Sequence, residues 1–123
     1  MSTIRVIVAD DHAAVRLGLA DYLGAQDGLE IVGQAVDGAD AVRLADSTEP
    51  DVVVMDINMP NLNGIEATRQ IKLLRPTVGV LLLTALEDED LVAAGREAGA
   101  DGFYLKGIFG SELVERVREV HAD

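Results

Sequence analysis

The 123-residue sequence contains no cysteine and no tryptophan, and aromatic residues make up only 3% of it. Without cysteine the chain forms neither disulfides nor thiolate metal sites, which fits a reducing compartment, and we expect a cytoplasmic protein. Hydrophobic residues nevertheless make up 49% of the sequence, so the core must be aliphatic. The length predicts a single domain over 1–123, with its core at about 4–121.

Basic side chains are also scarce, because 10 Lys and Arg stand against 22 Asp and Glu, giving a formal net charge of −12. Such an acidic surface repels nucleic-acid phosphates, which predicts that this domain does not itself bind DNA or RNA. The longest apolar runs have the length of strands and fall short of the ~20 residues that span a bilayer. We therefore expect no membrane segment, and the N-terminal residues predict no signal peptide.

The sequence does contain a regular alternation of short β-branched runs and longer helical ones. Runs typical of strands cover 4–9, 30–36, 51–55, 78–83 and 102–105. Apolar residues at helical spacing follow them over 14–23, 40–46, 65–74 and 88–98, and from a predicted N-cap at Ser111 onward. Five such units predict a flavodoxin-like α/β fold, (βα)5, with helices on both faces of a doubly wound parallel sheet in strand order 2-1-3-4-5.

Polar residues stand at the carboxyl ends of four predicted strands. Asp10 and Asp11 follow the first, Asp56 the third, Thr84 the fourth and Lys106 the fifth. These ends meet along one rim, where open parallel sheets bind ligands. Three carboxylates that lie so near one another need a cation to balance their charge, and oxygen ligands suit Mg²⁺. Lys106 and the Thr84 hydroxyl can then hold the oxygens of a phosphoryl group on Asp56, an accepted type of nucleophile.

Four motifs around these residues resemble the receiver domain of bacterial two-component response regulators, over roughly 4–120. They are VADDH at 8–12, VMDINMPNLNG at 54–64, LLTA at 82–85 and GFYLK at 102–106. Each motif alone would be weak, but together and in this order they are specific. The DDH opening and the EAGADGFYLK stretch at 97–106 are most similar to the NarL/FixJ-type subgroup.

The resemblance implies a role for each residue of the predicted site. Asp56 would be the phosphoacceptor and a ligand of Mg²⁺, with Lys106 as a second catalytic group. Asp11 would bind the metal directly, Asp10 would bind it through water, and Asn58 would bind it through its main-chain carbonyl. The phosphoryl donor would be a phosphohistidine on a partner sensor histidine kinase.

The resemblance also implies a conformational switch made of Thr84 and Phe103. On phosphorylation the Thr84 hydroxyl would turn toward the phosphoryl oxygens and Phe103 would rotate into the vacated space. Members of the subgroup tend to associate through their first and fifth helices, so a homodimer through these helices is expected. A full-length relative would continue into a linker and a helix-turn-helix output domain, which this chain does not contain. Asn58 and Leu86 are expected to influence the lifetime of the phosphorylated state.

The sequence departs from the family after Lys106, where many members carry a proline in a cis peptide. Gly107 stands there instead, and a cis bond without proline costs about 2.5–4 kcal/mol, so the conformation of the Lys106–Gly107 peptide stays open. Gly107 and Gly110 predict a flexible loop in which Ile108 and Phe109 are exposed.

The two histidines are expected to play lesser roles. His12 stands beside the predicted pocket and is expected to tune access to it rather than to bind metal. His121 falls in the last turn of the last helix, where a partial positive charge suits the helix dipole.

Other interpretations of these residues and of the whole chain remain open beside the phosphoacceptor role of Asp56. Asp10 or Asp11 could cap a helix, Asp56 could open a turn, Thr84 could cap a strand end and Lys106 could be a solvated charge. The chain could also be a phosphorylation-independent receiver-like binding module, although such modules usually lack one of these residues. An aspartyl-nucleophile phosphatase is disfavoured, because those enzymes carry a second Asp two residues after the nucleophile. Asn58 occupies that position, so only slow hydrolysis of the domain's own acyl phosphate is expected.

Overall fold

The computed structural model describes residues 3–85, 88–106 and 110–122, and within them the chain forms a five-stranded parallel sheet in the order β2-β1-β3-β4-β5. Its strands are β1 (Ile4–Ala9), β2 (Leu29–Ala35), β3 (Val52–Asp56), β4 (Gly79–Thr84) and β5 (Gly102–Leu105). The predicted fold and strand order are confirmed. As expected, the second strand lies at a sheet edge.

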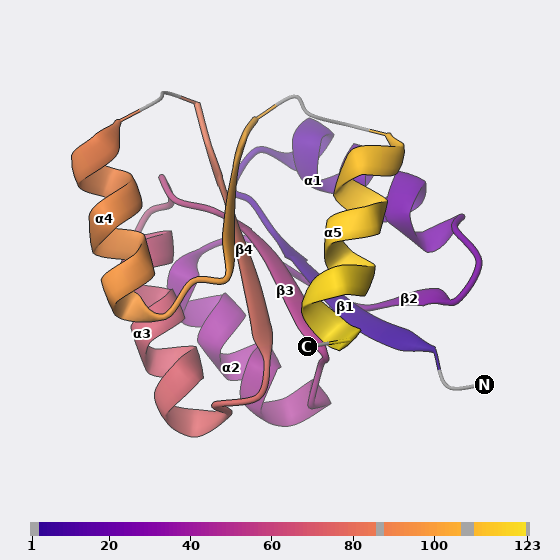
Figure 1. Cartoon of the computed structure of the whole chain (residues 1–123), viewed down its shortest axis with the longest axis horizontal. Helices are drawn as coiled ribbons and strands as arrows, with labels where there is room; N and C mark the ends of the chain where they lie inside the picture. Colours follow the sequence, from indigo (N-terminus) through magenta and orange to yellow (C-terminus); the bar gives the residue numbers. More distant parts are fainter. Residues whose placement is uncertain (1–2, 86–87, 107–109, 123) are drawn as a thin grey trace.

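A helix follows each strand within the same described residues. These helices are α1 (Ala13–Gly24), α2 (Gly38–Thr48), α3 (Gly64–Leu74), α4 (Glu89–Ala98) and α5 (Ser111–Ala122). Figure 1 shows α1 and α5 on one side of the sheet and α2, α3 and α4 on the other, which makes three layers. None of the helices so described is long and apolar enough to cross a membrane.

The core consists of two aliphatic clusters, one on each face of the sheet. Along β1, Val6 and Val8 pack with residues of α1 and α5, whereas Ile7 and Ala9 pack with residues of α2 and α3. This alternation follows from the opposite directions of successive side chains in a strand. All five residues of β3 are buried, which confirms that this strand is covered on both faces.

Side-chain caps account for some of the differences between the predicted and observed helix bounds. Asp37 accepts a hydrogen bond from the main-chain nitrogen of Asp40 at 2.7 Å, so α2 begins two residues before the predicted start. The last helix begins at Ser111, as predicted, but Ser111 lies inside the helix rather than at its cap. The main-chain oxygen of Gly110 accepts a bond from the nitrogen of Val114 at 3.4 Å, so Gly110 is the cap and Ser111 is the first helical residue.

Three predictions fall outside the described residues. They concern the role of Leu86, the Lys106–Gly107 peptide, and the exposure of Ile108 and Phe109.

Candidate functional site

The topology brings the predicted polar residues to one rim of the sheet. Asp10 follows β1, Asp56 ends β3 and Thr84 ends β4, while Lys106 comes directly after β5. The connection from β1 leads to α1 on one face and that from β3 leads to α3 on the other (Figure 1). The two connections diverge there, which leaves room at the carboxyl ends of β1 and β3.

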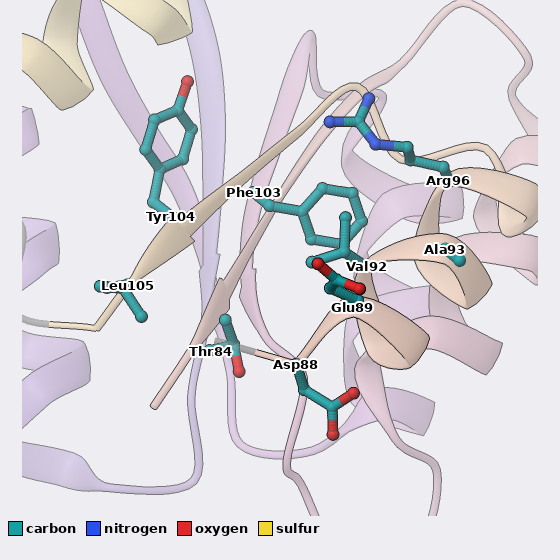
Figure 2. A pocket seen from close by; sticks show the side chains of 9 residues that line it. All are labelled: Thr84, Asp88, Glu89, Val92, Ala93, Arg96, Phe103, Tyr104 and Leu105. Atoms are coloured by element: carbon teal, nitrogen blue, oxygen red, sulfur yellow. The ribbon is translucent and has the colours of Figure 1, made fainter. Parts of the chain in front are cut away.

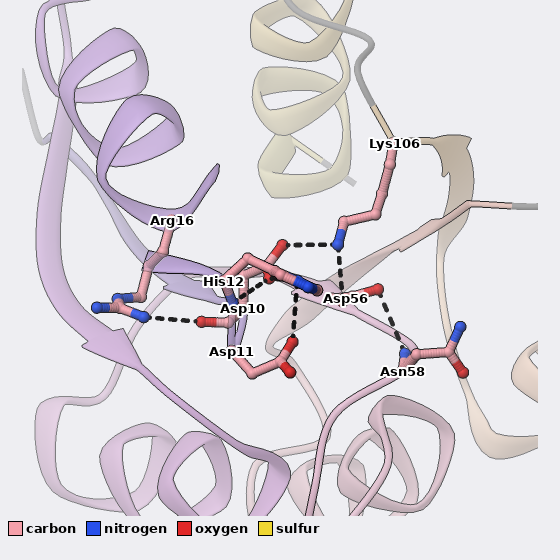
Figure 3. Close-up of polar contacts among 7 residues, drawn as sticks. All are labelled: Asp10, Asp11, His12, Arg16, Asp56, Asn58 and Lys106. Carbon is pink, nitrogen blue, oxygen red and sulfur yellow. Dashed lines mark hydrogen bonds and ion pairs between the residues drawn. The ribbon is translucent and has the colours of Figure 1, made fainter. Parts of the chain in front are cut away.

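Two buried carboxylates share one ammonium group at this rim (Figure 3). The side chain of Asp10 is 0% exposed and that of Asp56 is 1% exposed. Lys106 Nζ donates to Asp56 Oδ2 at 2.9 Å and lies 3.2 Å from Asp10 Oδ2. One positive charge therefore faces two negative ones in a poorly solvated place, which leaves an excess of negative charge to be compensated.

The pKa values of Asp56 and Lys106 follow from this placement. Burial raises the pKa of Asp56 above its usual value, although the Lys106 ammonium and the main-chain nitrogen of Asn58 oppose the rise. Burial by itself lowers the pKa of Lys106, but its hydrogen bonds and charge attraction to Asp56 and Asp10 outweigh this effect and raise it. Lys106 thus stays an ammonium, while Asp56 holds a proton more tightly than a free aspartate does.

Asp11 and His12 complete the cluster at its exposed edge. His12 Nδ1 lies 3.2 Å from Asp10 Oδ1 and 3.3 Å from Asp11 Oδ1, and the His12 main-chain nitrogen donates to Asp10 Oδ1 at 2.8 Å. His12 itself is the N-cap residue of α1. The alternative in which Asp10 or Asp11 caps this helix is therefore wrong.

The cluster fits a divalent cation. One ligand atom from each of Asp10, Asp11, His12 and Asp56 lies within 4.8 Å of all the others. Asp10 Oδ2 is buried, and its partner is the Lys106 ammonium at 3.2 Å, which Asp56 shares. Two carboxylates thus share one ammonium, and a cation would supply the positive charge that they lack.

The loop after Asp56 folds back closely onto the strand that it leaves. Asn58 donates its main-chain N–H to Asp56 Oδ1 at 3.3 Å, and Gly64 donates its own to the oxygen of Ile57 at 2.7 Å. A Cβ on Gly64 would lie 2.4 Å from the main-chain oxygen of Asp56. The space beside the Asp56 main chain therefore requires a glycine at position 64.

The same loop is fastened to the start of α2 on its other side. Asn61 Nδ2 donates to Asp37 Oδ2 at 2.7 Å. A Cβ on Gly38 would lie 1.9 Å from the main-chain oxygen of Leu62, so only glycine allows this approach. These contacts were not predicted, because they depend on how closely the loop packs against the start of α2.

Thr84 and Phe103 line one groove of about 610 Å³ between α4 and β5. Figure 2 shows the Phe103 ring directed toward α4, while Tyr104 points to the other side. A Cβ on Gly95 would lie 2.4 Å from Phe103 Cζ, and the Arg96 guanidinium lies 5.4 Å from the ring centre. The structure thus brings the two predicted switch residues to one groove, with the ring seated against α4.

Arg16 is a site neighbour that the sequence reasoning missed. Its Nη1 donates to the main-chain oxygen of Asp10 at 3.0 Å, and its Nε donates to Gln34 Oε1 at 3.3 Å. The signal was its position one helical turn after His12, which places a basic side chain on the turn of α1 nearest the acid pair. Arg16 therefore ties the β1–α1 turn to the edge strand.

The sequence model of the response regulator receiver domain matches residues 6–118. The response regulator GacA of Pseudomonas aeruginosa is 40% identical over 119 residues, which are 97% of this chain and 56% of GacA. The transcriptional regulatory protein LiaR of Bacillus subtilis is 43% identical over 115 residues, which are 94% of this chain and 54% of LiaR. The chain thus spans about half the length of these relatives.

A solved structure agrees with the sequence matches. The signal receiver domain of the response regulator NarL from Mycobacterium tuberculosis superposes with a TM-score of 0.94 at 31% identity, covering 99% of this chain and 98% of that one. With its fold, its acid cluster and these relatives, the chain belongs to the family of response regulator receiver domains.

Proposed function

We propose that Asp56 accepts a phosphoryl group from the phosphohistidine of a sensor histidine kinase, and that the domain then changes conformation to control an output. The observation that supports this most directly is the hydrogen bond of 2.9 Å from Lys106 Nζ to the buried Asp56 carboxylate. A buried carboxylate beside a fixed ammonium is prepared to accept more negative charge.

The transfer makes one bond and breaks one. A carboxylate oxygen of Asp56 attacks phosphorus, the phosphorus–nitrogen bond to the kinase histidine breaks, and the leaving imidazole keeps the electron pair and takes up a proton. The Lys106 ammonium, already 2.9 Å from Asp56 Oδ2, neutralises charge on the transferred group. Mg²⁺, when bound by Asp11, Asp56 and the Asn58 carbonyl and through water by Asp10, would neutralise the remaining phosphoryl oxygens.

The proposed readout is the rearrangement of Thr84 and Phe103. Thr84 is buried at the end of β4, and its main-chain oxygen accepts a bond of 2.7 Å from the nitrogen of Lys106. Its hydroxyl would turn toward the phosphoryl oxygens, and Phe103 would move within the groove that it shares with Thr84. Such a motion converts a local change of charge into a change of surface beside α4.

The alternative functions are less well supported. A phosphorylation-independent binding module would have no need to keep Lys106 between the buried carboxylates of Asp10 and Asp56. A phosphatase acting on outside substrates would need a general acid where Asn58 stands. Slow hydrolysis of the acyl phosphate on Asp56 is the turnover that we propose instead.

The proposed setting follows from the relatives. LiaR is named a transcriptional regulatory protein, and we propose a transcriptional output through a helix-turn-helix domain, with no nucleic acid bound by the receiver itself. The kinase would meet this domain in the cytoplasm. A homodimer through α1 and α5 is supported by their position on one face of the sheet (Figure 1) and by Leu17 of α1, which is 50% exposed.

Intact-mass measurement after incubation with Mg²⁺ and acetyl phosphate tests the phosphoacceptor. We expect the mass of one phosphoryl group, lost both in Asp56→Asn and on chelation of Mg²⁺. An unchanged mass, where a known receiver domain is modified, would favour the inert binding module. Elution volume with and without the phosphoryl mimic BeF3⁻ tests the dimer, and identical elution would contradict it.

A further inference from the structure

The ring of Phe103 contacts two consecutive residues of α4. It rests against the backbone of Gly95, where an added Cβ would lie 2.4 Å from Phe103 Cζ and 2.6 Å from Cε1. The guanidinium of Arg96 lies over the ring, with its Cζ 5.4 Å from the ring centre. This is the distance of a cation–π contact. Gly95 thus provides the space that the ring occupies, and Arg96 covers the ring.

The charge of Arg96 is directed to this ring rather than to a carboxylate. Among the described residues, its guanidinium forms no ion pair. Asp88 and Glu89, the acids that line the same groove, stand at the start of α4, whereas Arg96 lies in its last turn. A cation in the last turn also suits the dipole of α4, and that simpler role would not need the ring. The two roles differ in what they predict for the switch.

The proposed motion of Phe103 would break its contact with Arg96. In Figure 2 the ring lies between Arg96 and Thr84, which stand on opposite sides of it. Rotation of the ring into the space vacated by the Thr84 hydroxyl would therefore carry it away from Arg96. The contact exists only in the position that the ring has in this structure, so it favours that position over the switched one.

We propose that Arg96 is a positioning residue that holds Phe103 in its resting place through the cation–π contact, and so sets the fraction of molecules that are ready to bind a phosphoryl group. This inference rests on the proposed function, because it concerns the switch that phosphorylation of Asp56 would drive. Arg96 touches neither Asp56 nor the acid cluster among the described contacts. Its effect would therefore pass through the ring alone.

The expected effect has a definite size and sign. A cation–π contact at an exposed site changes an equilibrium about 2- to 5-fold. The apparent Kd of a ligand that binds only the minor, switched state varies inversely with the population of that state. Loss of the Arg96 contact should therefore strengthen the binding of a phosphoryl analogue by this factor. Simple charge attraction predicts the opposite sign, because removing a cation weakens the binding of an anion.

The apparent Kd for BeF3⁻ in the presence of Mg²⁺, measured from the ¹⁹F NMR signal of the bound ion, gives the first test. We expect Arg96→Gln to bind BeF3⁻ about 2- to 5-fold more tightly than the wild type, and Arg96→Lys, which keeps a cation, to lie between them. Arg69→Gln is the matched control, because it removes the same charge from an exposed ion pair with Glu66 on α3. That control should not bind more tightly than the wild type.

The same measurement without the aromatic ring separates positioning from a general effect of charge or helix stability. In the Phe103→Leu background, Arg96→Gln should no longer strengthen the binding of BeF3⁻. Circular dichroism checks that each variant is folded. A gain of the same size in the presence and in the absence of the ring would overturn the inference, and so would an unchanged or weaker affinity in Arg96→Gln.

Proton NMR of the protein without BeF3⁻ tests the resting contact by itself, because protons above an aromatic face resonate upfield. We expect the δ protons of Arg96 to be displaced upfield in the wild type and to have ordinary shifts in Phe103→Leu. Ordinary shifts in the wild type would overturn the inference alone. A wild type that neither binds BeF3⁻ nor gains mass with acetyl phosphate would instead refute the proposed function, and with it the switch on which this inference rests.

Discussion

The Lys106 ammonium and the Asp56 carboxylate form a hydrogen bond of 2.9 Å across two strands that are not neighbours in the sheet. Strand β4 separates their two strands, so this contact exists only when all three have their native positions. Because Asp56 is buried and the bond is charge-assisted, the pair joins the chemistry of the site to the integrity of the sheet.

Protonation of Asp56 should make the free energy of unfolding depend on pH. Burial raises its pKa in the folded protein above the unfolded value of 3.8. The folded state therefore binds this proton more tightly, and the stabilisation, present at low pH, is lost as pH rises from about 4 through the folded pKa. Denaturant unfolding in chelator at a series of pH values should show this loss in the wild type, but not in Asp56→Asn. Asp21→Asn, on an exposed position of α1, is the charge-matched control, and equal pH profiles for all three proteins would contradict the prediction.

Mg²⁺ should stabilise the folded protein through the acid cluster. A ligand that binds only the folded state at 100 times its Kd adds about 2.7 kcal/mol to the free energy of unfolding. We expect a rise in melting temperature with Mg²⁺ for the wild type and for Asp21→Asn, and a much smaller rise for Asp11→Asn. Differential scanning fluorimetry over a Mg²⁺ series measures it. A full response in Asp11→Asn would remove this residue from the proposed ligands.

Gly64→Ala should destabilise the fold and slow phosphorylation, because the new Cβ would lie 2.4 Å from the main-chain oxygen of Asp56. Forcing extra volume into a packed place costs about 1–3 kcal/mol, and here the strain falls on the loop that carries Asn58. Gly18→Ala is the matched control, because a Cβ there meets nothing within 4 Å and lies inside α1. That control should gain up to about 1 kcal/mol. Urea unfolding measures the stability, and the rate of mass gain with acetyl phosphate measures the phosphorylation. Wild-type values of both in Gly64→Ala would contradict the described loop.

Gly95→Ala should displace the ring of Phe103, because the added Cβ would lie 2.4 Å from Phe103 Cζ. We expect a loss of stability that the smaller side chain in Gly95→Ala/Phe103→Leu partly restores. A double-mutant cycle should give a coupling of about 0.5–3 kcal/mol between the two positions. Additive effects would mean that the ring does not rest on α4 at Gly95.

The sequence could predict the elements that carry strong local signals. The strand at 102–105 has the predicted bounds, and the end of α4 at Gly99 follows from a left-handed C-cap with φ of 111°. The start of α2 was placed late, because the Asp37 side chain holds a first turn whose apolar pattern is weak. The cap at Gly110 was missed, because serine is the commoner residue there.

The contacts of the site also fall into those that the sequence predicts and those that it does not. Strand topology alone predicts that Asp10, Asp56 and Lys106 meet, since the carboxyl ends of parallel strands share one rim. It cannot predict the bond from Arg16 to the Asp10 carbonyl, or that Gly95 faces Phe103, because these depend on helix rotation and on the distance between packed backbones. Such distances are set by the whole core rather than by any local run of residues.

The two sides of the site differ in how tightly they are packed. On one side the β3–α3 loop is held against α2 by the hydrogen bond from Asn61 to Asp37 and by the close approach of Gly38 to Leu62. On the side toward α2, the two backbones pack so closely that they leave no space for a shift. The opposite flank, toward α4, borders an open groove. Among the described residues, a charge added at Asp56 would meet a closely packed loop toward α2 and an open groove toward α4. We therefore expect the structural response to phosphorylation on the α4 side of the molecule.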